Sequence, residues 1–141
     1  MSQLEKAIVL ATTAHQGQTD KGGHPYILHP LRIMMRMKSE DEMIVAVLHD
    51  VIEDTTITYE DLEKEGFASS IIESITALTR KPSEDYMDFI NRCKQNEIAR
   101  KVKMQDISDN MNLSRMGDMD LTDKDYSRQK KYAKALRILL G

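Results

Sequence analysis

Apolar residues in this chain recur at spacings of three and four, and glycines fall only between the stretches that show this pattern. From Gln3 to His15, Leu4, Ala7, Ile8, Ala11 and Ala14 recur at these spacings. Such spacing places side chains on one face of a helix. A glycine inside a helix costs about 1 kcal/mol relative to alanine, and none interrupts these stretches. The pattern predicts an all-α protein.

Turn residues, prolines and capping residues divide the chain into eight expected helices. They cover residues 3–15, 30–37, 41–53, 58–66, 68–78, 83–93, 97–113 and 123–140. Thr58 and Thr122 are expected N-caps, and Gly117 is expected to close the loop before the last helix. We find no strand alternation and no internal repeat. The expectation is a compact single-domain bundle of about seven or eight helices over residues 1–141.

Composition and charge exclude several functional classes. The net charge of −3 gives no basic surface for nucleic acid. Cys93 is the single cysteine, so an internal disulfide is excluded. No apolar run approaches the roughly 20 residues that span a bilayer, and the first ten residues do not resemble a signal peptide. We therefore expect a cytoplasmic protein, and the sequence leaves its oligomeric state open.

Four ionisable residues lie inside or beside the apolar run Ala46–Thr55. They are His49, Asp50, Glu53 and Asp54. A buried charge costs several kcal/mol or more unless it is paired or binds a metal. On a continuous helix, Glu53 would share a face with both His49 and Asp50. We interpret this stretch as half of a metal site.

The remaining ligands are expected from two other helices. An antiparallel arrangement of helices 30–37 and 41–53 would bring His29 beside His49, and imidazole suits transition metals. Asp106 and Asn110 are four residues apart, so they share a helix face with apolar neighbours. We favour Asp106 over Asp109 as a ligand and expect Asp109 to be solvated.

Four segments, in this order, resemble the HD superfamily of metal-dependent phosphohydrolases. They are Ala14-His-Gln-Gly-Gln18, Pro25-Tyr-Ile-Leu-His-Pro30, Leu48-His-Asp-Val-Ile-Glu-Asp-Thr55 and Val102-Lys-Met-Gln-Asp106 with Asn110. The similarity is greatest to the hydrolase domain of the Rel/Spo stringent-response enzymes and their small stand-alone relatives. The resemblance implies an all-helical fold and a divalent metal, usually Mn²⁺. The ligands that it implies are His29, His49, Asp50 and Asp106.

The resemblance also implies a reaction, the removal of pyrophosphate from the 3′ position of guanosine tetra- or pentaphosphate. Glu53 and Asp54 match the family's Glu-Asp pair, which would orient or deprotonate the attacking water. Residues implied to contact the substrate are Lys21, Asn110, Arg128 and Tyr132. For Lys21 the alternative is a solvated lysine, and for Tyr132 it is core packing.

One position departs from the family where the guanine base is expected to lie. Asp20 stands where relatives with this activity usually carry an arginine that packs on the base. Loss of a planar cation weakens the case for that nucleotide. The alternatives are hydrolysis of a different nucleotide or small phosphoester, or a non-catalytic nucleotide sensor that binds metal.

Overall fold

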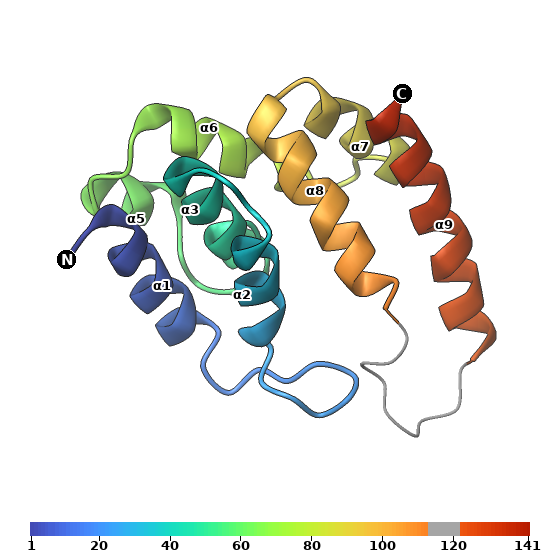
Figure 1. The fold of residues 1–141 in the computed structure, drawn as a ribbon, viewed down its shortest axis with the longest axis horizontal. Coiled ribbons are helices and arrows are strands. Elements are labelled where there is room, and N and C mark those ends of the chain that lie inside the picture. Colours follow the sequence, from blue (N-terminus) through green and yellow to red (C-terminus); the bar gives the residue numbers. More distant parts are fainter. Residues whose placement is uncertain (113–121) are drawn as a thin grey trace.

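The computed structural model describes residues 1–112 and 122–141, and in that part of the chain it contains nine helices and no strand (Figure 1). The helices are α1 (Gln3–Ala14), α2 (Leu28–Met35), α3 (Glu40–Leu48), α4 (Val51–Asp54), α5 (Tyr59–Lys64), α6 (Ser69–Ala77), α7 (Tyr86–Lys94), α8 (Glu97–Asn110) and α9 (Asp123–Leu140). The all-α prediction is confirmed. The expected helix end at Leu113 and the loop at Gly117 lie outside the described residues.

Local sequence signals set the helix boundaries. Thr58 and Thr122 begin α5 and α9 with reciprocal capping boxes, as predicted. Gly17 and Gly66 adopt a φ of 86°, a conformation that L side chains rarely adopt, and follow the ends of α1 and α5. The second helix begins at Leu28 rather than Pro30 and ends at Met35 rather than Met37, a difference within the uncertainty of boundary prediction.

Helix α3 lies at the centre of the fold and contacts α1, α2, α6 and α8. Every residue from Ile44 to Asp50 is buried, which explains why this stretch is apolar on all faces rather than on one. Full burial of each large apolar side chain contributes about 1.5–3 kcal/mol. Helix α8 contacts α3 on one side and α7 and α9 on the other, so it joins the two ends of the bundle (Figure 1).

The predicted continuous helix over residues 41–53 is wrong, because the structure breaks it between α3 and α4. Asp50 has φ −123° and ψ 14°, outside the helical region. In a continuous helix the Ala46 carbonyl would accept the Asp50 N–H, whereas here it accepts a hydrogen bond from the His49 ring at 2.7 Å. The extra helix relative to the eight predicted arises from this break.

Within the described residues, none of the helices is both long enough and apolar enough to cross a membrane.

Candidate metal centre

Four side chains from three parts of the fold converge at one buried point. His29 lies in the first turn of α2, His49 and Asp50 lie in the break after α3, and Asp106 lies on α8. The His29 Nε2 is 2.8 Å from the Asp106 Oδ1, and the His49 Nε2 is 3.4 Å from the same oxygen. The Asp50 Oδ2 is 3.6 Å from the His49 Nε2. The fold thus brings together the four residues that were predicted from the sequence as metal ligands.

Hydrogen bonds on the far side of each ring point both histidines towards this centre. The Nδ1 of His49 bonds the Ala46 carbonyl, and the Nδ1 of His29 lies 2.6 Å from the Asp109 Oδ2. With Nδ1 carrying the proton, the Nε2 of each ring presents a lone pair to the centre. A carboxylate or carbonyl behind a histidine is the usual support for a metal ligand.

The geometry and chemistry of this donor set fit a divalent cation. Donor atoms about 2.0–2.2 Å from one metal lie about 3.0–3.5 Å from each other, close to the separations given above. His29, His49 and Asp50 alone offer three donor atoms within 4.8 Å of one another. Two imidazoles with two carboxylates make the mixed nitrogen and oxygen set that transition metals accept.

The electrostatics of the centre are dominated by its carboxylates. Burial on its own lowers the pKa of His49, but the charges of Asp50 and Asp106 outweigh it and raise the pKa to about 9. Burial opposes ionisation of Asp106, yet Lys103 and His49 hold its pKa well below the usual range. The site therefore keeps both carboxylates ionised and attracts positive charge, as a proton or as a metal.

Asp50 is contacted by two residues outside the four converging side chains, His15 and Tyr26. Tyr26 donates its hydroxyl proton to the Asp50 Oδ2, and the buried His15 Nε2 lies 3.3 Å from the Asp50 Oδ1. This second contact is an ion pair when the His15 ring is protonated. Tyr26 precedes α2, and the centre of its ring lies 5.6 Å from that of the His29 ring.

Lys103 is a further residue that sequence reasoning missed. Its ammonium donates to the Asp106 Oδ2 at 2.8 Å, and only 13% of its side chain is exposed. It lies three residues before Asp106, so the two share a helix face. Asp109 was expected to be solvated, and this was wrong: it is 1% exposed and accepts hydrogen bonds from His29 and Arg32.

Glu53 and Asp54 follow the centre on α4 but do not join the four converging groups. The break at Asp50 removes the shared helix face that the sequence predicted for Glu53. The Glu53 carboxylate instead accepts the backbone N–H of Arg80. Partial burial, followed by the charges of Asp50 and Glu53, raises the pKa of Asp54.

The four residues expected at the substrate occupy different surroundings. Asn110 donates to the Asp106 Oδ1 at 3.3 Å, so it borders the centre. The Lys21 ammonium lies 2.7 Å from Asp125 on α9, and Arg128 lies 3.5 Å from the same carboxylate. Tyr132 is partly buried against the core.

The loop that carries Lys21 is shaped by Asp20. Its Oδ1 accepts the backbone N–H groups of Gly22 at 2.9 Å and His24 at 3.0 Å. This is a local side-chain turn of the kind that aspartate favours. Asp20 therefore stabilises the loop, and it also gives this position a negative charge where relatives usually carry an arginine.

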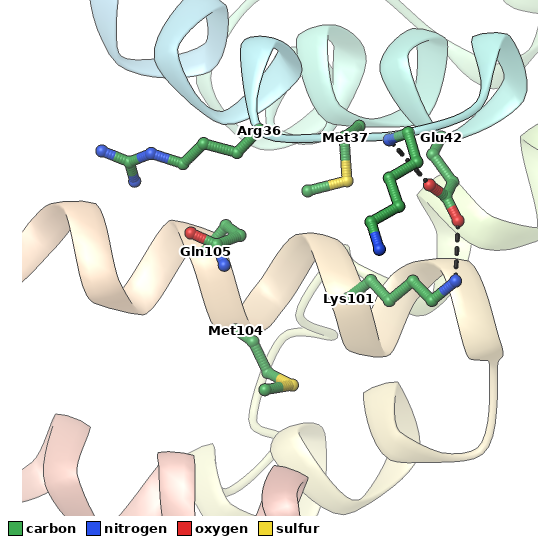
Figure 2. A pocket seen from close by; sticks show the side chains of 7 residues that line it. Arg36, Met37, Glu42, Lys101, Met104 and Gln105 are labelled. Atoms are coloured by element: carbon green, nitrogen blue, oxygen red, sulfur yellow. Dashed lines mark hydrogen bonds and ion pairs between the residues drawn. The ribbon is translucent and has the colours of Figure 1, made fainter.

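A pocket of about 250 Å³ opens between the α2–α3 turn and α8. Figure 2 shows Met37 on the α2–α3 side of the pocket and Gln105 on the α8 side, with the Lys101 ammonium on the Glu42 carboxylate at one end. None of the converging groups lines it. Arg36 connects the two regions, because it lines the pocket and lies 3.4 Å from Asp109 behind His29.

Comparison with known proteins identifies relatives of most of the chain. The family model described as HD domain matches residues 7–140. The bifunctional (p)ppGpp synthase/hydrolase SpoT of Escherichia coli K12 is 36% identical over 113 residues, covering 77% of this chain and 16% of SpoT. A guanosine-3′,5′-bis(diphosphate) 3′-pyrophosphohydrolase of Vibrio cholerae is 38% identical over 111 residues, covering 75% of this chain and 15% of the relative.

A solved structure shares the fold over the full length. It is described as a metazoan ortholog of SpoT that hydrolyses ppGpp, and it superposes with a TM-score of 0.80 at 22% identity, covering 100% of this chain and 87% of that one. The chain spans about one sixth of the length of the bacterial relatives. The match over residues 7–140 nevertheless includes each of the four converging residues, and the chain belongs to the HD domain family.

Proposed function

We propose that this chain is a metal-dependent phosphohydrolase whose substrate is guanosine 3′,5′-bis(diphosphate), from which it releases the 3′ pyrophosphate. The observation that carries the proposal is the buried convergence of His29, His49, Asp50 and Asp106. The names of the relatives, pyrophosphohydrolases of this nucleotide, support the substrate. We further propose that residues 1–141 act as one hydrolase domain in the cytoplasm.

The four converging residues would hold the metal, with Mn²⁺ as the expected ion. A bound divalent cation would polarise a phosphoryl oxygen and make water a better nucleophile at neutral pH. Tyr26 and His15 fix the Asp50 carboxylate, and Asp109 fixes the His29 ring. Preorganisation of this kind keeps the donors in place before substrate arrives.

Glu53 and Asp54 would share the handling of the proton. The Arg80 N–H holds the Glu53 carboxylate in a fixed position, from which it can orient a water. Asp54 has a raised pKa, so its carboxylate is a stronger base than an ordinary aspartate and is suited to take the proton. Lys103 offsets negative charge beside Asp106, where the phosphoryl group would develop it.

Lys21, Asn110, Arg128 and Tyr132 would contact the nucleotide. Lys21 and Arg128 share the Asp125 carboxylate, which places two cations from distant segments near each other. A second candidate function, hydrolysis of a different phosphorylated nucleotide, is favoured by Asp20. Its carboxylate is committed to the loop backbone, and it cannot stack on a base as arginine does.

A substrate panel with metal analysis tests the proposal. Protein purified without chelator should contain a divalent metal, which His49→Ala and Asp50→Ala should lose and the exposed-site control His24→Ala should retain. With added Mn²⁺, the parent should release pyrophosphate from guanosine 3′,5′-bis(diphosphate). Turnover of another nucleotide only would establish the second candidate, and tight binding without turnover would indicate a sensor. Undiminished metal in the His49 and Asp50 variants would refute the ligand assignment.

A further inference from the structure

A group of cations and tyrosines lies beside the metal centre, where α6, α7, α8 and α9 meet. We call it the basic–aromatic cluster; its members are Arg80, Tyr86, Lys103, Arg128, Lys131 and Tyr132. The Lys131 ammonium is 4.4 Å from the centre of the Tyr86 ring and 5.6 Å from that of Tyr132. The Arg80 guanidinium carbon is 5.6 Å from the centre of the Tyr86 ring.

The positive charge of this cluster is only partly neutralised. Lys103 is paired with Asp106, and Arg128 lies 3.5 Å from Asp125. Lys131 has no carboxylate within ion-pair distance among the described residues, and the Arg80 side chain donates to the Glu84 backbone carbonyl instead. Partial burial and the neighbouring cations lower the pKa of Lys131. Such a positive field stabilises a bound anion.

The Tyr86 hydroxyl adds a hydrogen-bond donor to this field. Its oxygen is buried and has no partner within the described part of the chain. Burial raises the pKa of Tyr86 to about 12, so the group remains a protonated O–H at neutral pH. A buried hydroxyl without a partner is unfavourable, and an oxygen of a bound ligand would satisfy it.

The cluster is continuous with the metal centre through side chains in contact. The Lys103 ammonium bonds Asp106 and lies 5.0 Å from the centre of the Phe89 ring. The Phe89 ring packs edge-on against Tyr86 at 6.2 Å between centroids. Lys103 therefore lies between Asp106 of the metal centre and the aromatic pair Phe89 and Tyr86, so the cluster borders the centre.

We propose that Arg80, Tyr86 and Lys131 form a second anion subsite, which binds a phosphate of the substrate other than the one held at the metal centre. This inference rests on the proposed phosphohydrolase function and extends it. The subsite selects nucleotides that carry more than one phosphate group in reach of the centre. That second phosphate is either part of the 5′ diphosphate or the terminal phosphate of the 3′ diphosphate, which is released.

Equilibrium binding tests this subsite without requiring turnover. In an Asp54→Asn background, to slow hydrolysis, Mn²⁺-loaded protein is titrated by calorimetry with guanosine 3′,5′-bis(diphosphate), with guanosine 3′-diphosphate and with inorganic pyrophosphate. Lys131→Met removes the least neutralised cation, and Tyr86→Phe removes the hydroxyl but keeps the ring under Lys131. Lys134→Met removes a charge of the same type from an exposed position on the same helix and is the control.

Lys131→Met and Tyr86→Phe should each weaken binding of the bis(diphosphate) about tenfold, as expected for a charge-assisted hydrogen bond, whereas Lys134→Met should not. Unchanged binding of guanosine 3′-diphosphate would assign the subsite to the far diphosphate, and equal losses for all three compounds would assign it to the released one. Undiminished affinities in Lys131→Met and Tyr86→Phe, or equal losses in Lys134→Met, would overturn the proposal of a second anion subsite.

The two proposals fail in distinguishable ways. A parent that binds the bis(diphosphate) without hydrolysing it, and loses that affinity in Lys131→Met, has the subsite but not the activity. A parent that hydrolyses it, with affinity unchanged in both variants, has the activity but not the subsite. A parent that binds none of the three compounds overturns both.

Discussion

Replacement of Asp109 by asparagine should weaken metal binding although Asp109 is not among the four proposed ligands. The carboxylate is 1% exposed and lies 2.6 Å from the His29 Nδ1. It also accepts from the Arg32 Nε at 2.9 Å and Nη2 at 3.0 Å. An asparagine of the same shape keeps one acceptor oxygen but turns an NH₂ group towards a donor, either His29 or Arg32. The His29 ring then loses the support that fixes its tautomer and orientation.

Loss of such support behind a metal-bound histidine typically costs 10- to 100-fold in metal affinity, equivalent to about 1.4–2.7 kcal/mol. Competition with a fluorescent chelator would measure the Mn²⁺ affinity of Asp109→Asn against the parent. Asp88→Asn, an exposed substitution on α7, is the matched control. Circular dichroism would verify that the variant is folded. A folded Asp109→Asn protein with the parent's Mn²⁺ affinity would refute the proposed role of this carboxylate.

Two further predictions concern the scaffold. Leu48→Ala, at a fully buried position on α3, should lower the free energy of unfolding measured in urea by about 2–5 kcal/mol. The control Val9→Ala, at an exposed position on α1, should change it by less than about 0.5 kcal/mol. Similar losses in the two variants would show that α3 is not the core element. The Arg92 guanidinium lowers the pKa of Glu84 from 4.5 to about 2, so this pair stabilises the fold above pH 4.5 and the contribution is lost as the pH falls towards 2. Calorimetric melting of Glu84→Gln should therefore show a weaker decline in Tm across that range than the parent, and identical declines would contradict the pairing.

The sequence predicted which four side chains converge, because each kind of evidence for them is local. His49 and Asp50 stand out as ionisable residues in a stretch that must be buried, and Asp106 stands out among apolar helix positions. The antiparallel packing of α2 and α3, expected from the short turn between them, places the ring centroids of His29 and His49 5.6 Å apart. The roles of these residues in binding a metal remain predictions.

The parts that sequence reasoning missed depend on contacts between distant segments. Asp109 has the local appearance of a solvated residue. Only the packing of α8 on α2 brings it into contact with His29, which is 80 residues away in the chain. Glu53 was assigned to a helix face that does not exist, because the His49 side chain takes the carbonyl that a continuous helix would use. Helical periodicity cannot anticipate a side chain that competes with the backbone for an acceptor.

The sequence by itself determined the helical class, most helix boundaries and the residue types of the candidate metal centre, because periodicity, caps and buried charges are recorded within short stretches of chain. Tertiary structure alone decided how those groups are supported and what surrounds them. The contacts of Tyr26 and His15 with Asp50, and of Lys131 with Tyr86, join residues far apart in the chain. Such pairs form only when several helices pack at once, and no local pattern specifies that packing.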